Sequence, residues 1–305
     1  MLTRRRFIAI SATAIAVSLT HHVRAEPSAR HWTGQALGAR TSIWLDHPDA
    51  AAISNQVLAE IARLEGILSL YRPDSAIVRL NRNGRLEAPP FELLECLSIA
   101  DAIHKGSGGL FDPTVQPLWA LWAEAAAAGR RPAQSDIDAA RNSVGWEKVV
   151  LDSAAITLQP GMSITLNGVG QGYVADRIAA MLEAEGLDNI LIDAGEFRAI
   201  GGEPDGGAWP VQLDSGGRVE LRGRALATSA PLGTTFDPAG NDGHILNPKT
   251  GSPVRPFWRS VSISAPSAAV ADAISTAACL MGDDEAVERL TARFAGARVE
   301  SLMRG

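Results

Sequence analysis

The sequence has only two cysteines in 305 residues, Cys96 and Cys279. Both lie in apolar helical patterns, where a buried free thiol is the commoner state, although a disulfide is possible in an oxidising compartment. Neither has the spacing of a metal ligand. The chain also lacks a Gly-x-Ser-x-Gly elbow, a zinc-protease motif and a lysine after a phosphate-binding glycine loop. Nothing in the sequence therefore supports a Ser–His–Asp hydrolase.

Basic residues are fewer than acidic ones, 28 against 34, which gives a formal net charge of −6. The first 25 residues contain four arginines and no acid, so their removal changes the charge from −6 to −10. Such an acidic body disfavours nucleic acid or anionic lipid as a partner. An anionic substrate would need local compensation from a metal or from backbone dipoles.

The N-terminus lacks a hydrophobic run long enough to span a bilayer comfortably. Its apolar stretch follows Arg4-Arg5-Arg6 and ends near Leu19, before the small-residue site Val23-Arg24-Ala25. This pattern predicts a twin-arginine-type signal peptide over residues 1–25, cleaved after Ala25. An uncleaved membrane anchor is the competing interpretation. Residues 26–305 would then form a periplasmic protein of one large domain or two intimately joined ones.

The rest of the pattern predicts an α+β fold, with mixed sheets and packed helices in two lobes of one unit. The alanine-rich segment 123–132 is expected to be a surface excursion. The strand at 189–195 is compatible with either a parallel crossover or antiparallel pairing. Helices are expected at 50–68, 75–81, 90–105, 135–142, 173–185 and 266–281, and strands at 31–45, 149–151, 155–158, 189–195, 209–213, 218–221, 225–229 and 258–263.

A glycine-rich loop lies between Ile164 and Asp176. A short apolar, strand-like run leads into Gly168, Gly170 and Gly172, and an amphipathic helix is expected to begin near Tyr173. Backbone N–H groups at such a helix start suit a phosphate. An ordinary tight strand-to-helix connection explains the loop equally well.

One acidic residue occupies a helix of small and apolar residues. Asp272 and Thr276 are four residues apart, so they share one helix face. A carboxylate in such surroundings must find a partner or bind a cation. Magnesium commonly uses few protein oxygens and completes its shell with waters and substrate phosphates. A capping or salt-bridged aspartate is the alternative.

Three loop segments carry further candidates. His244, the only histidine in the second half of the chain, could act as a general base or orient a ligand, and structural hydrogen bonding is the alternative. Tyr71 could offer a ring face to a planar ligand or simply pack at the rim of the core. Leu110-Phe111-Asp112-Pro113 suggests a pocket wall, or only a helix–helix connection.

Taken in order, these motifs resemble the ApbE family of FAD:protein FMN transferases. The similarity extends from Leu37-Gly38 to Gly282. With the twin-arginine-like leader, the chain looks most like the periplasmic NosX branch, which is associated with nitrous oxide respiration. The motifs are Tyr71-Arg72-Pro73-Asp74-Ser75, Gly109 to Val115, Leu166 to Tyr173, Ala227-Thr228-Ser229, His244 to Gly251, and Ala271-Asp272 with Thr276.

The resemblance implies a specific reaction. A family member would bind FAD and magnesium and transfer FMN to a threonine hydroxyl of a client flavoprotein, releasing AMP. His244 would sit near the phosphates and assist the incoming hydroxyl, with Asp272 as the second catalytic residue. The metal would be held by Asp272, Thr276 and the backbone carbonyl of Gly170, and FAD would be lined by Leu37, Tyr71, Leu110, Phe111, Asp112, Asn167 and Tyr173.

Four positions depart from the commonest family pattern. Thr165 and Asn247 stand where aspartate is frequent, Gln171 where lysine is frequent, and Ala230 where glycine is frequent. Loss of a lysine beside the phosphates is expected to lower the transfer rate or alter ligand preference. An FAD pyrophosphatase and a non-catalytic FAD-binding assembly factor are therefore the alternatives to a transferase.

Overall fold

The computed structural model describes residues 30–37 and 39–305. The predicted signal peptide, its cleavage site and Gly38 lie outside the described residues. Within the described part of the chain, none of the helices combines the length and apolar character that a membrane span needs.

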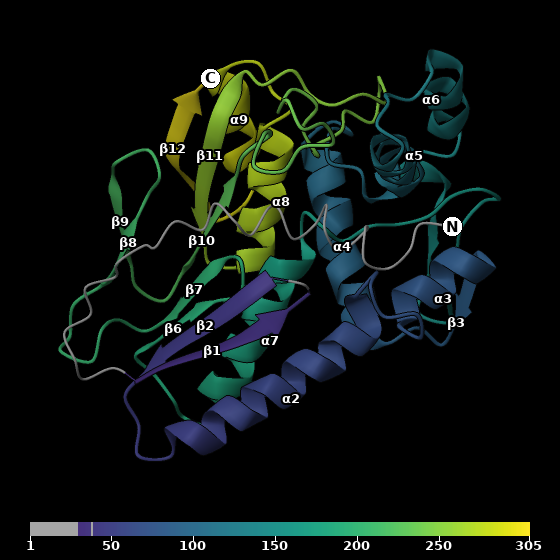
Figure 1. Cartoon of the computed structure of the whole chain (residues 1–305). Coiled ribbons are helices and arrows are strands. Elements are labelled where there is room, and N and C mark those ends of the chain that lie inside the picture. The colour runs from purple at the N-terminus through teal and green to yellow at the C-terminus, as the bar shows by residue number, and fades with distance from the viewer. Residues whose placement is uncertain (1–29, 38) are drawn as a thin grey trace.

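A seven-stranded sheet forms the centre of the fold (Figure 1), in the order β1-β2-β6-β7-β10-β11-β12. Each neighbouring pair is antiparallel, so β6 joins the sheet without the parallel crossover that the sequence left open. The strands are β1 (Arg30–Ala36), β2 (Ala39–Leu45), β6 (Ile190–Asp193), β7 (Phe197–Ile200), β10 (Ala225–Ser229), β11 (Trp258–Ala265) and β12 (Arg298–Arg304).

The two faces of this sheet bury alternate side chains. In β6, Ile190 and Ile192 belong to the main core, whereas Leu191 packs with Trp209 and Leu221 of a hairpin on the opposite face. The hairpin consists of β8 (Trp209–Gln212) and β9 (Arg218–Leu221). Helices α7 (Gly170–Ala184) and α8 (Ala268–Ala278) cover the main-core face (Figure 1).

The remaining helices lie mostly beside the sheet, and several of them share its core. Leu64, Leu97, Val174 and Ile274 belong to one continuous apolar cluster, so the two parts form a single unit. A small sheet has the order β3-β5-β4. The remaining α-helices and the strands of the small sheet are α2 (Ala50–Leu68), α3 (Ala76–Asn83), β3 (Arg85–Glu87), α4 (Phe91–Gly106), α5 (Gln116–Ala127), α6 (Gln134–Arg141), β4 (Val150–Leu151), β5 (Ala155–Thr157) and α9 (Asp284–Thr291).

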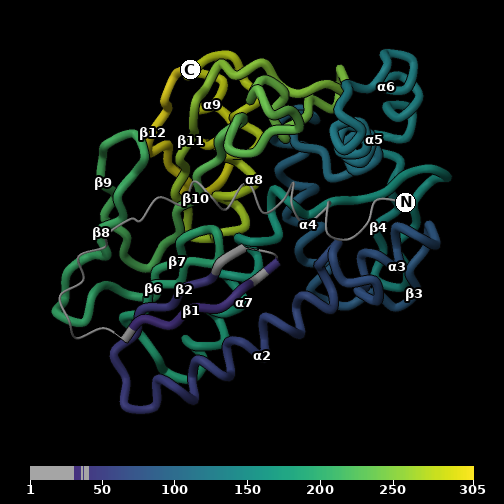
Figure 2. The backbone as a smooth tube through the Cα atoms, viewed as in Figure 1, coloured from purple at the N-terminus to yellow at the C-terminus, as the bar shows by residue number. Residues whose placement is uncertain are grey.

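A second, smaller core supports the chain between β10 and β11. This segment extends toward α5 and α6 (Figure 2), where Phe236 packs against Trp119 and Trp122 with ring centroids 5.6 and 5.8 Å apart. Arg131 forms two hydrogen bonds with Asp242 at 2.5 and 2.6 Å. The His244 segment is therefore braced by residues more than 100 positions earlier in the chain.

The mixed α+β architecture is confirmed, and the long helix expected at 50–68 is α2. Cys96 and Cys279 are free and buried, as the pattern favoured. The sequence did not predict β3, β7, α9 or β12.

Two predictions of local structure were wrong. The segment 123–132 is not wholly a surface excursion, because α5 continues to Ala127 and buries Ala123 and Ala125. The run before the glycine loop is not a strand, because the side chain of Asn81 takes the place of a neighbouring strand. Its amide bonds the carbonyl of Ile164 at 2.8 Å, and its oxygen accepts the N–H of Ile164 at 2.7 Å.

Candidate active site at the start of α7

The glycine loop forms the first turn of α7, three residues earlier than predicted. The backbone of Gly172 lies directly against α8, since a Cβ added there would be 2.3 Å from the carbonyl oxygen of Ala268. Any side chain would therefore force the two helices apart. This approach lets the N–H of Gly172 face Asp272 Oδ2 at 3.4 Å.

Asp272 is a buried carboxylate with little compensation. Its relative exposure is 4%. The long bond from Gly172 is its only side-chain hydrogen bond among the described residues, and no ion pair to it is found there. Burial raises the pKa of Asp272 from 3.8 to about 7, against a small lowering by Gly172. A buried charge in this position favours a cation as its partner.

A second buried acid, Glu196, was missed by sequence reasoning. It follows Gly195 in the turn between β6 and β7, and its carboxylate accepts the N–H of Thr228 at 3.3 Å. Burial, followed by the negative charges of Asp272 and Asp193, raises the pKa of Glu196 well above its usual value. The available clue was an acid placed directly after the small-residue turn that ends the expected strand at 189–195.

Hydroxyl groups gather where α8 meets the end of β10. Thr276, one turn later on α8, is 3.2 Å from Ser229 Oγ through its own Oγ1. Ser229 at the end of β10 also lies 2.7 Å from Ser275 Oγ. Thr276 thus lies against an oxygen-rich strand end, one helical turn after Asp272.

These oxygen donors fit magnesium. Hard carboxylate, hydroxyl and carbonyl oxygens are the ligands that magnesium prefers, and it commonly keeps several waters. In the part of the chain that the structure describes, no three His, Cys, Asp or Glu side chains cluster to form a closed metal cage. The uncompensated charge of Asp272, beside the α7 turn that contains Gly170, therefore suits an ion that also takes waters or substrate phosphates.

Two apolar candidates for the flavin nucleotide contact the same loop. A Cβ added to Gly168 would lie 3.0 Å from Thr276 Oγ1 and 3.1 Å from the ring of Phe111. Leu37 lies in the β1–β2 turn, and its Cδ1 would be 3.3 Å from a Cβ added to Gly170. Asn167 is exposed on the turn just before α7, and Leu110 is half-buried next to Phe111.

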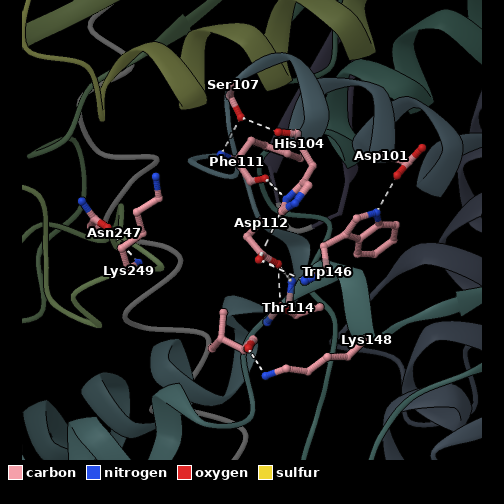
Figure 3. Close-up of polar contacts among 12 residues, drawn as sticks. Asp101, His104, Ser107, Phe111, Asp112, Thr114, Trp146, Lys148, Asn247 and Lys249 are labelled. Atoms are coloured by element: carbon pink, nitrogen blue, oxygen red, sulfur yellow. Dashed lines mark hydrogen bonds and ion pairs between the residues drawn. The ribbon is translucent and has the colours of Figure 1, made fainter.

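Asp112 lies within an internal polar network (Figure 3). Its carboxylate accepts Thr114 N at 2.8 Å, Thr114 Oγ1 at 2.5 Å and Trp146 N at 3.2 Å. His104 Nδ1 lies 2.8 Å from the carbonyl oxygen of Phe111. Burial raises the pKa of Asp112, against its hydrogen bonds. In this structure Asp112 shapes the 110–115 segment from inside the protein.

Both tyrosines on the flavin side are held by the protein. Tyr173 is 2% exposed, and its hydroxyl donates to Glu95 Oε2 at 2.5 Å. Burial and this acid raise the pKa of Tyr173. Tyr71 is half-buried, with its N–H bonded to Ser69 Oγ at 3.2 Å. Tyr173 therefore supports the glycine turn from the core rather than presenting an exposed ring.

His244 is fixed on the loop between β10 and β11. Its Nδ1 lies 3.1 Å from the carbonyl oxygen of Thr234, and burial lowers the pKa of the ring. A carbonyl only accepts, so a neutral ring carries its proton on Nδ1 and its lone pair on Nε2. That state suits a general base. Among the described residues, no hydrogen bond joins His244 to Asp272.

Comparison with known proteins places this geometry in a family. A family model described as the ApbE family matches residues 37–299. The chain belongs to the ApbE family. It is 27% identical to an FAD:protein FMN transferase of Haemophilus influenzae, with 92% of this chain and 88% of that protein covered. A second such transferase, of Salmonella typhimurium, is 28% identical over 87% and 82% of the two chains.

Solved ApbE structures share the fold. The ApbE protein of Thermotoga maritima aligns with a TM-score of 0.79 and 27% identity, covering 91% of this chain and 97% of that chain. The apo form of the flavinyl transferase ApbE of Pseudomonas stutzeri aligns with a TM-score of 0.76 and 27% identity, covering 87% and 88%.

Gln171 occupies the position where the resemblance leads one to expect lysine in the ApbE family. Its side chain lies against the β6–β7 turn, since a Cβ on Gly195 would be 2.6 Å from Gln171 Nε2. An uncharged amide adds no positive charge beside the turn that leads to Glu196. Gln171 therefore supplies no positive charge near Asp272.

Proposed function

We propose that this chain transfers FMN from FAD to a threonine hydroxyl of a client flavoprotein, uses magnesium, and releases AMP. The buried, weakly compensated carboxylate of Asp272 beside the glycine turn of α7 carries this proposal. The names of the relatives, FAD:protein FMN transferase, support the flavin-transfer chemistry.

The reaction exchanges one phosphorus–oxygen bond for another. The threonine oxygen attacks the phosphorus of the FMN half of FAD, and the bond to the bridging oxygen breaks so that AMP leaves with that oxygen. His244 Nε2 takes the threonine proton while Thr234 holds Nδ1 in place. Asp272, Thr276 and the carbonyl of Gly170 would hold magnesium, which would neutralise phosphate charge when bound.

Leu37, Leu110 and Phe111 form the apolar side of the flavin site, next to the loop that contains Asn167. Asp112 and Tyr173 would support this surface from inside the protein, because their polar side-chain groups are hydrogen-bonded to other protein groups. Tyr71 completes the rim.

The proposed cellular location rests on the signal-peptide pattern of residues 1–25. The twin-arginine-like residues 1–25 support export to the periplasm, where the client would be an exported or membrane-bound flavoprotein. The NosX-like resemblance supports a client that serves nitrous oxide respiration. A pull-down from periplasm of denitrifying cells, followed by a search for covalent flavin on the captured protein, tests this part. Capture only of proteins without covalent flavin would refute it.

The transfer itself is tested with purified chain, FAD, magnesium and a candidate flavin-accepting domain. Covalent flavin fluorescence on the client, lost on chelation and on threonine-to-alanine change in the client, is expected. Free FMN and AMP without client labelling would indicate a pyrophosphatase, and unchanged FAD would indicate a binding factor. Asp272→Ala should abolish labelling. Asp283→Ala, which removes the N-cap of α9, is the matched control and should retain it.

A further inference from the structure

Asp176 connects the two helices that form the candidate metal site. It lies on α7, and its carboxylate accepts three hydrogen bonds from the start of α8. The donors are Ser267 Oγ at 2.7 Å, Ala268 N at 2.8 Å and Ala269 N at 3.0 Å. These backbone N–H groups belong to the first turn of α8, where no partner within the helix is available. The carboxylate also suits the positive end of the helix dipole.

The cap of α8 is therefore shared between two elements. Ser267 Oγ accepts Val270 N at 3.2 Å, as an ordinary N-cap does. Asp176 satisfies the N–H groups that Ser267 does not reach, and it does so from a different helix. Arg198 of β7 forms an ion pair with the same carboxylate, its Nε 3.3 Å from Asp176 Oδ1, although this Nε makes no hydrogen bond within the described residues. The Arg198 side chain is only 13% exposed, so this ion pair is well shielded.

The contacts of α7 and α8 run in antiparallel order. Gly172 and Asp176 are four residues apart and share one face of α7, while Ala268 and Asp272 share one face of α8. Gly172 approaches Asp272, and Asp176 binds the start of α8 one turn away. Asp176 thus fixes the position of α8 along α7. That position determines how far Asp272 and Thr276 lie from the turn that contains Gly170.

We propose that Asp176 is a positioning residue that sets magnesium affinity without touching the ion. This inference rests on the metal site of the proposed function. Groups that orient metal ligands commonly change affinity by about 10- to 100-fold when they are removed. The role differs from simple helix capping, because a cap that only stabilises the fold leaves metal affinity unchanged.

Asp283 provides a matched control for this distinction. It also caps a helix through its carboxylate, accepting Ala286 N at 2.7 Å at the start of α9. No candidate metal ligand lies on α9. Substituting either aspartate removes a capping interaction, but of the two only Asp176 is hydrogen-bonded to the start of α8. Both substitutions are expected to lower the melting temperature.

The test is calorimetric titration of magnesium alone into the mature chain without FAD, with melting temperatures measured in parallel. Asp176→Ala should weaken binding by about 10- to 100-fold, and Asp283→Ala should match the wild-type chain. Asp176→Asn keeps one acceptor oxygen, so a smaller loss is expected, and this variant provides the same test if Asp176→Ala does not fold.

Two kinds of failure are distinguishable. Wild-type affinity in both Asp176 variants, with binding still abolished by Asp272→Ala, would refute the positioning role and leave the metal site intact. Absence of magnesium binding to the wild-type chain, or full binding to Asp272→Ala, would instead refute the metal site itself, and the positioning role with it. An equal loss of affinity in Asp283→Ala would show that general destabilisation is responsible and would also overturn the proposal.

Discussion

Replacing Asp272 by asparagine is expected to stabilise the metal-free protein at pH 8. The carboxyl has a pKa of about 7 in the folded chain against an ordinary value of 3.8. As the pH rises between these values, the unfolded chain releases this proton while the folded chain retains it. The free energy of unfolding therefore falls with rising pH, and the loss is complete once the pH exceeds the folded pKa.

The size of the effect follows from that difference. A pKa that moves from 3.8 to about 7 corresponds to about 4 kcal/mol of lost stability above pH 7. Asparagine carries no charge and avoids this loss, and its oxygen can still face the N–H of Gly172. Its amide N–H groups need partners, and leaving them without any costs about 1 to 3 kcal/mol. A net gain of about 1 to 3 kcal/mol is expected at pH 8.

The measurement is urea unfolding at pH 5 and pH 8 with a chelator present, repeated at pH 8 with magnesium. Wild type should gain about 2.7 kcal/mol when magnesium is present at 100 times its dissociation constant, and Asp272→Asn should gain nothing. Asp112→Asn is the contrasting control. This buried aspartate accepts three protein hydrogen bonds, so the same substitution should destabilise the chain.

Either of two results would refute the reasoning. Easier unfolding of Asp272→Asn than of wild type at pH 8 without metal would show that the carboxylate has a favourable partner in the folded chain. The second refuting result is an advantage of the variant that does not shrink between pH 8 and pH 5. In that case burial of the charge would not be its cause.

Three further substitutions test the surroundings of the site. Glu196→Gln removes a neighbouring negative charge, so magnesium affinity measured by calorimetry should fall several-fold; unchanged affinity would contradict this. His244→Ala should lower kcat for client labelling by about 100-fold while the FAD dissociation constant changes little. Equal losses would indicate a binding role. Arg131→Met leaves the buried Asp242 carboxylate without this partner and should lower both kcat and the melting temperature; an unchanged kcat would show that this brace does not support His244.

The sequence predicts most strongly where local periodicity decides the structure. The stripe formed by Ile53, Val57, Ile61 and Leu64 gives α2 its buried face without reference to any distant element. The shared helix face of Asp272 and Thr276 was equally readable. Both features depend on spacing within a single helix, which the sequence contains in full.

Distant partners account for the errors. Ile164 lies in an apolar run that resembles a strand, yet its backbone bonds the side chain of Asn81, 83 positions away. Glu196 has an ordinary sequence context, and its importance arises only when the β6–β7 turn is buried near Asp272. Likewise, Tyr173 follows a loop that suggests ligand contact, but α4 supplies Glu95 as its partner.

The charges around α7 explain why a cation fits this site better than a protein side chain. Asp272 and Glu196 place two acids in buried surroundings, and Gln171, the side chain nearest the intervening turn, is neutral. Arg198 lies nearby, but its positive charge is committed to Asp176 and Glu183. The fold therefore uses the partly buried Arg198 to pair with acids of α7 and leaves Asp272 uncompensated. A divalent ion that arrives with an anionic substrate would satisfy both the acid and the phosphates.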